Sequence, residues 1–171
     1  MDYKKKYLKY KNKYLMLKNQ IGKGSTFMEV DSTPTILVPG GDYVITGLIS
    51  CVGVIIKKIN PSNFTFNDGI AVHFVDGVHF NNGIITPQGN IVLNSISAYI
   101  NSWNVDDTID LDIVYSPHMD GKIMKASKEI IVLITKWFQS LKTWSNVTIS
   151  KKPTPLNKEQ TGYLHKYTFR A

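Results

Sequence analysis

Residues 50–59 read Ser-Cys-Val-Gly-Val-Ile-Ile-Lys-Lys-Ile, a β-branched and largely apolar run. A strand with one solvated face alternates apolar and polar residues, and residues 51–56 do not alternate. The stretch therefore predicts a strand that is covered on both faces, inside a layered core.

The rest of the chain mixes strand-like and helix-like patterns. Further strands are expected at Thr35–Val38, Tyr43–Ile49, Gly69–Val75, Val78–Phe80, Thr108–Tyr115, Val147–Ser150 and Tyr163–Phe169. Apolar residues at helical spacing predict one helix from Pro87 to about residue 103 and another over Ala126–Trp144. The order of elements predicts a mixed α/β fold, a layered sheet or sandwich with about two packed helices, and 171 residues suit one such domain.

A tight hairpin is expected at Asp76-Gly77, a dipeptide that favours type I′ turns. This turn would pair Phe74 with His79 and His73 with Phe80. Because side chains alternate across a strand, His73 and His79 would then lie on opposite faces. Only one of the two histidines could serve a site on a given side.

The first 21 residues have the pattern of a basic amphipathic helix. Aromatic and aliphatic residues recur at intervals of four and three, as in a short coiled coil, and lysines fill the other faces. The stretch Tyr7–Leu15 resembles the leaders found on many giant-virus proteins. A glycine-containing stretch then ends the helix, which divides the chain into a helix at 1–21, a linker at 22–32 and a globular α/β domain at 33–171.

The positive charge is confined to the N-terminal segment. Residues 1–24 carry eight lysines and one aspartate, which accounts for the whole formal charge of +7, and the remainder is neutral. Self-association through residues 1–21 is therefore the first expectation, and nucleic acid or an anionic membrane is the less favoured partner. We expect an intracellular protein, in the host cytoplasm or the virion if the chain is viral, because no secretory signal or membrane-spanning run is recognisable.

Cys51 is the only cysteine in the chain, and His73 follows it in Ala-Val-His-Phe. A thiolate is a much better nucleophile than a thiol, and a nearby imidazole can remove the thiol proton. If the strands that carry the two residues are neighbours, Cys51 and His73 could form such a pair. The alternative is that both residues only fill the core. No metal-ligand spacing and no cofactor motif is present, so neither a metal nor a cofactor is expected.

Two segments resemble the chemotaxis glutamine deamidase family CheD, which shares its fold with toxins such as cytotoxic necrotizing factor. Residues 46–54 are similar to that family's Leu-Gly-Ser-Cys-Val-Gly/Ala-Val segment, with Ile49 in place of the glycine, and residues 69–74 resemble the segment that leads into its His-Phe. The resemblance implies that Cys51 attacks the side-chain amide of a protein glutamine and that His73 acts as the base. It also implies an orienting role for Thr46, and support of the oxyanion by Ser50 and Val52.

Two classes of function follow. The first is a thiol-dependent glutamine deamidase or amidohydrolase that acts on a protein substrate, and the shared thioester leaves transglutamination open as a related reaction. The second is a non-catalytic virion or interaction module that keeps the α/β scaffold and self-associates through the N-terminal helix.

Overall fold

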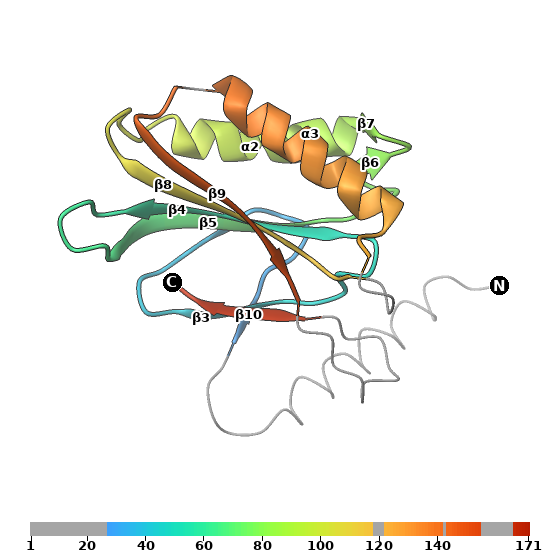
Figure 1. Ribbon diagram of the computed structural model, residues 1–171, viewed down its shortest axis with the longest axis horizontal. Coiled ribbons are helices and arrows are strands. Elements are labelled where there is room, and N and C mark those ends of the chain that lie inside the picture. Colours follow the sequence, from blue (N-terminus) through green and yellow to red (C-terminus); the bar gives the residue numbers. More distant parts are fainter. Residues whose placement is uncertain (1–26, 118–121, 142, 155–165) are drawn as a thin grey trace.

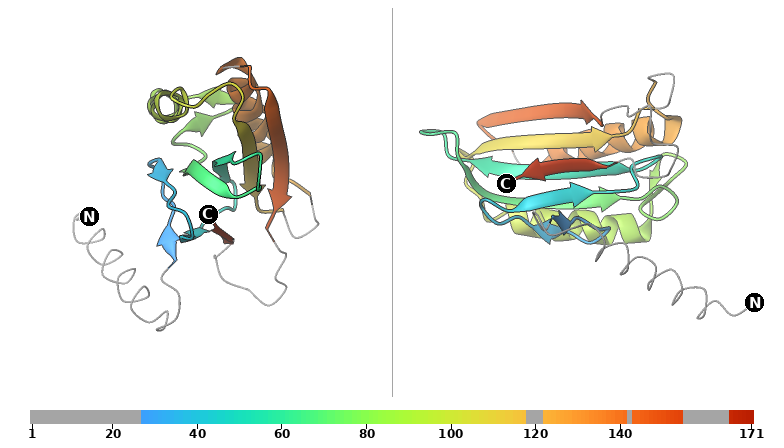
Figure 2. Two further views of the ribbon diagram at one scale, coloured as in Figure 1. Left: turned by 90° about the vertical axis from the view of Figure 1, so that its left-hand side faces the viewer. Right: turned by 90° about the horizontal axis from the view of Figure 1, so that it is seen from below.

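The computed structural model describes residues 27–117, 122–141, 143–154 and 166–171, and these form a mixed α/β fold in layers. A five-stranded sheet of order β2-β5-β4-β8-β9 lies in the middle, with α2 and α3 on one face and the three-stranded sheet β1-β3-β10 on the other (Figure 1 and Figure 2). The predicted fold class is confirmed at this level. The elements are β1 Met28–Glu29, β2 Thr35–Ile36, β3 Asp42–Ile45, β4 Val52–Ile59, β5 Phe66–Phe74, β6 Phe80–Asn81, β7 Ile84–Ile85, α2 Pro87–Ile100, β8 Thr108–Tyr115, α3 Lys125–Leu141, β9 Asn146–Pro153 and β10 Tyr167–Arg170.

The central strand β4 is covered on both faces, as its sequence predicts. It pairs antiparallel with β5 and with β8 over its whole length. Val52, Val54 and Ile56 point into the main core beneath the helices, whereas Ile55 belongs to a second cluster beneath the small sheet. Alternate positions of one apolar run thus serve two separate cores.

Both predicted helices are present; the first begins at Pro87 as predicted, and the other ends differ from the predicted ones by one to three residues. The first begins where Thr86 accepts a hydrogen bond from the Gly89 amide at 3.1 Å, with Pro87 at the first helical position. Their inward faces supply much of the main core. The buried residues are Val92, Leu93, Ile96 and Ile100 from α2, and Ile130, Ile131, Ile134 and Phe138 from α3.

The carboxylate of Asp68 holds the end of α2 to β5. It accepts hydrogen bonds from the Tyr99 hydroxyl, from Trp103 Nε1 at 3.0 Å and from the Gly69 amide at 2.8 Å. Burial, together with the bond to Asp68, raises the pKa of Tyr99. The bonds from Tyr99 and Trp103 to one partly buried carboxylate link the helix layer to the sheet, and the Gly69 amide, in β5 itself, adds a local bond to the same group.

The prediction of a hairpin at Asp76-Gly77 is wrong. Strand β5 ends at Phe74, and the segment after it folds into turns in which the His79 amide bonds to the Val75 carbonyl. The two-residue hairpin lies further along, between β6 and β7, at Asn82-Gly83. Both of its central residues have positive φ, 49° and 73°, as a type I′ turn requires. Asn-Gly is itself a strong signal for this turn.

The described fold begins earlier than residue 33. Strand β1 lies within the stretch 22–32 expected as a linker, and it pairs parallel with Tyr43–Val44 of β3. The helix predicted at 1–21 lies outside the described residues, as does part of the strand predicted at Tyr163–Phe169. In the part of the chain that the structure describes, no helix has the length and apolar character needed to cross a bilayer.

Replacing Asp68 with alanine is expected to lower the free energy of unfolding by about 2–4 kcal/mol, because several partly buried donors lose a charged acceptor. Tyr99→Phe should cost less, about 1 kcal/mol, since it removes one donor and leaves the carboxylate with its other two. Urea unfolding of both variants measures the difference. A cost for Asp68→Ala no larger than that for Tyr99→Phe would contradict this account of the contact.

Candidate functional site

Cys51 is buried directly before the first residue of β4, with 8% of its surface exposed. The chain reaches it by a sharp change of direction after β3. Gly47 makes this turn with a φ of 74°, a left-handed conformation that glycine adopts without strain. The short segment that follows, from the buried Leu48 to Ser50, leads into β4.

His73 lies on β5, and its Cα partner on β4 is Gly53. The strand that Cys51 precedes and the strand of His73 are therefore neighbours, which is the condition on which a Cys51–His73 pair depends. Gly53 and Ile55 share with His73 and Ala71 the sheet face that the small sheet covers. Cys51 stands two residues before Gly53, and the same alternation, if continued one residue before the strand, would place it on the face of His73.

The His73 ring is held in its neutral form. Burial lowers its pKa below the ordinary value, the charge of Asp31 raises it, and the nearby His79 lowers it. The backbone amide of His73 donates to the Asp31 carbonyl at 2.9 Å, which ties β5 to the segment between β1 and β2. His73 Nε2 is buried and has no hydrogen-bond partner in the described part of the chain. A neutral imidazole with an unpaired nitrogen can accept a proton.

Thr46 follows β3, and its hydroxyl donates to Glu29 Oε1 at 2.7 Å. The neighbour that contacts His73 is Gly47: a Cβ added there would lie 3.6 Å from His73 Cε1. The backbone of the turn after β3 therefore lies along the edge of the imidazole. In this structure the Thr46 hydroxyl is bound to a carboxylate on β1.

Ser50 and Val52 flank Cys51 in different environments. Ser50 is half-buried, whereas Val52 is fully buried and its side chain enters the main core. Val52 is paired with Phe74 on one side and with Tyr115 on the other. Since the backbone N–H of a strand residue points along the sheet, the Val52 amide is directed at a neighbouring strand rather than out of the sheet face.

His79 is a buried structural residue in the turn after β5. Its Nδ1 accepts a hydrogen bond from the Val75 amide at 2.9 Å, so the proton of the neutral ring is on Nε2. The ring lies edge-on to Phe74, with 5.7 Å between centroids, and burial lowers its pKa. This bond fixes the position of the His79 ring. Of the two histidines in the described residues, His73 is the one whose Nε2 is buried without a hydrogen-bond partner.

Two residues around the site, Glu29 and Asp31, were not predicted from the sequence. Glu29 is the second residue of β1, a strand of two residues that pairs parallel with β3, and Asp31 follows two residues later. Strands this short carry no periodic pattern, and parallel partners can be far apart in the sequence. The only signal available was the presence of two carboxylates next to a strand-like apolar segment.

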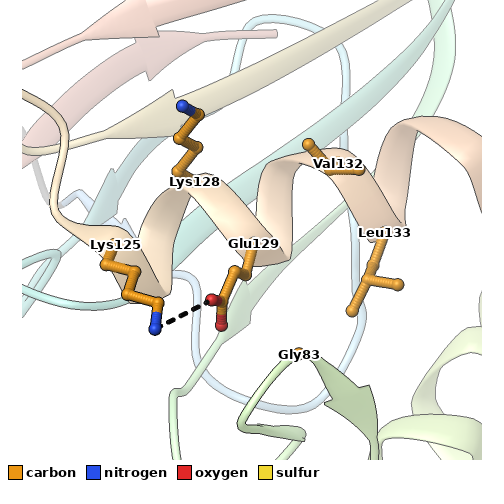
Figure 3. A pocket seen from close by; sticks show the side chains of 6 residues that line it. All are labelled: Gly83, Lys125, Lys128, Glu129, Val132 and Leu133. Atoms are coloured by element: carbon orange, nitrogen blue, oxygen red, sulfur yellow. Dashed lines mark ion pairs between the residues drawn. The ribbon is translucent and has the colours of Figure 1, made fainter.

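A separate hollow of about 410 Å³ lies between α3 and the β6–β7 hairpin, and Figure 3 shows its lining. Val132 and Leu133 supply the apolar part, and Lys125 forms an ion pair with Glu129 at 3.8 Å. None of the predicted site residues lines it. Among the described residues, no group of three or more His, Cys, Asp or Glu side chains could hold a metal ion.

In comparisons with protein-family models and with curated proteins, no family and no protein matches this chain. The chain is thus a layered mixed α/β domain in which a buried cysteine directly precedes one strand and a histidine lies on the adjacent strand.

The contribution of the two histidines to the free energy of unfolding is expected to be fully present well above pH 6.5 and to be lost as the pH falls through 6.5. The pKa values of His73 and His79 are lowered from 6.5 in the folded state, so the unfolded chain takes up protons first and is favoured by acid. The variant His73→Asn should show a shallower decrease. Urea titrations between pH 6.5 and about 5 measure this, and parallel curves for variant and wild type would contradict the burial effect on His73.

Gly47→Ala and Gly40→Ala form a matched pair. Both glycines have left-handed φ values, 74° and 76°, and each alanine is expected to cost about 1–2 kcal/mol of unfolding free energy. The new methyl group at Gly47 makes only ordinary contact with His73, and the one at Gly40 meets nothing within 4 Å. The two costs should therefore agree, and a clearly larger loss for Gly47→Ala would show that its surroundings are tighter than described.

Proposed function

We propose that this chain is a thiol-dependent amide hydrolase of the glutamine-deamidase type, with a CheD-like fold. The similarity of residues 46–54 and 69–74 to that family's segments supports the proposal. The layered α/β architecture is compatible with it, and so is the pairing of β4 with β5.

The observation that carries the proposal is the state of His73. A buried polar atom without a partner costs about 1–3 kcal/mol, and such atoms are rare in folded proteins. His73 Nε2 is in this position, on a strand directly beside the one that Cys51 precedes. Its lowered pKa keeps the ring neutral, as a general base must be. A role for Nε2 as the acceptor of the thiol proton would account both for its missing hydrogen-bond partner and for the neutral ring.

The reaction would proceed in two halves. The Cys51 thiol gives its proton to His73, and Sγ attacks the carboxamide carbon of a glutamine side chain to form a tetrahedral oxyanion. Collapse of this intermediate breaks the C–N bond, and the protonated histidine delivers its proton to the departing ammonia. Water then attacks the thioester, giving one proton to His73, and the thiol leaves with that proton to release glutamate.

Donors for the oxyanion would come from the chain around Cys51. The family resemblance assigns this support to Ser50 and Val52, and Ser50 is the one that is half-buried rather than sealed in the core. Only a small part of Cys51 is exposed, so a substrate would reach the thiol only if the chain around it moves. Ile49, 38% exposed, lies two residues before Cys51.

Cys51→Ala is expected to abolish release of ammonia from glutamine-containing proteins, and His73→Ala to reduce it by about 10²–10⁴-fold because the general base is lost. Ammonia is measured by a coupled assay, and conversion of glutamine to glutamate by mass spectrometry. His79→Asn is the matched control: it replaces a histidine but keeps an acceptor for the Val75 amide. It should retain activity.

Alkylation tests the thiol independently of any substrate. Since the chain has one cysteine, every label added by iodoacetamide reports on Cys51. Wild type should react faster than His73→Ala near neutral pH, because the imidazole removes the thiol proton. A Cys51 that reacts only after unfolding in urea would refute the proposed enzyme.

A non-catalytic interaction module is the second candidate. It is favoured by the exposure of Phe27 and Met28, 42% and 44%, at the start of the described chain and next to the segment expected to self-associate. An inert Cys51 together with self-association of the full chain would support this reading.

A further inference from the structure

β9 forms one edge of the five-stranded sheet. It is eight residues long and pairs parallel with β8 over that whole length. No strand in the described ranges pairs with its other side, and Figure 2 shows it as the outermost strand. A long edge strand exposes a row of backbone N–H and C=O groups that can pair with another strand.

The positions that face outward follow from one hydrogen bond. The Thr154 amide donates to the Tyr115 carbonyl at 2.8 Å, so Thr154 and every second residue before it direct their backbone groups toward β8. Val147, Ile149 and Lys151 consequently direct theirs away from the sheet. Pro153 is also an outward-directed position. Because its backbone does not point at β8, its lack of an N–H removes no hydrogen bond between β9 and β8.

We propose that β9 pairs antiparallel with β9 of a second copy of this chain, about a twofold axis at Ile149. Ile149 then faces Ile149 of the other copy, and Val147 of each copy faces Lys151 of the other. All of these are outward-directed positions, so each facing pair exchanges both of its N–H···O bonds. The interface is self-complementary, as twofold symmetry demands, and it continues the sheet from one copy into the other.

The side chains favour this register. Each Lys151 lies opposite an uncharged valine, and in the alternate positions Thr148 faces Ser150 and Asn146 faces Lys152. Lys152 already has a partner in its own copy, Asp112 Oδ1 at 2.8 Å. A twofold axis at Lys151 would instead place the two lysines opposite each other, a destabilising like-charge pair.

Pairing would also bury apolar surface. Ile149 packs against the main core and is half-buried, and Val147, 38% exposed, lies on the same face of β9. A second strand at this edge would cover both side chains.

The test uses Val147→Lys and Val147→Glu in the full chain, with sedimentation equilibrium as the measurement. Val147→Lys puts a lysine opposite Lys151 at two symmetric places and should raise the dimer dissociation constant by about 3- to 30-fold. Val147→Glu puts a carboxylate opposite the same lysine and should leave the dissociation constant unchanged or lower it. The double variant Val147→Lys/Lys151→Glu should restore the dimer, which separates register-specific repulsion from a folding defect.

Three results would overturn the proposal. The first is a wild-type chain that stays monomeric across micromolar concentrations. The second is a dimer whose dissociation constant is the same in wild type and in both Val147 variants, which indicates association elsewhere, such as through residues 1–21. The third is equal weakening by lysine and glutamate at residue 147, without rescue in the double variant.

Discussion

The rest of the structure depends on one constraint: β4 is paired along both of its edges and covered on both of its faces. A shift of one residue in its register would exchange the side chains of Val54 and Ile55 between the two cores. The same register places Gly53 opposite His73. The packing of the fold and the position of the candidate base are therefore fixed together.

The candidate site lies where the small sheet meets this strand. A Cβ at Gly53 would lie 2.6 Å from Ile45 Cδ1, so the absence of a side chain at Gly53 lets β3 approach closely. Gly47 then carries the chain past His73 without adding bulk. A side chain at Gly53 would displace Ile45, and one at Gly47 would strain the backbone, whose φ is 74° there.

Much of this fold could be predicted from periodicity. Both helices and the strand Thr108–Tyr115 were found because long amphipathic or alternating segments carry strong patterns. The local sequence could not show which of Asp76-Gly77 and Asn82-Gly83 forms the hairpin, since both dipeptides favour the same turn. The contacts of His79 with the rest of the fold determine where the hairpin forms. The neighbours of the site were missed because β1 is too short to show a period.

A sheet whose central strand is fully covered still has two edges, and this chain protects them differently. β2 has only two residues, which leaves little to pair with, although Ile36 in it is 57% exposed. β9 has eight, and its protection is a lysine and a proline near one end. Because Lys151 repels only a partner that places positive charge opposite it, this protection rejects the registers with a basic residue there and tolerates those with a neutral one. The edge is thus selective rather than closed, which is the condition under which a sheet edge can form a specific interface instead of aggregating.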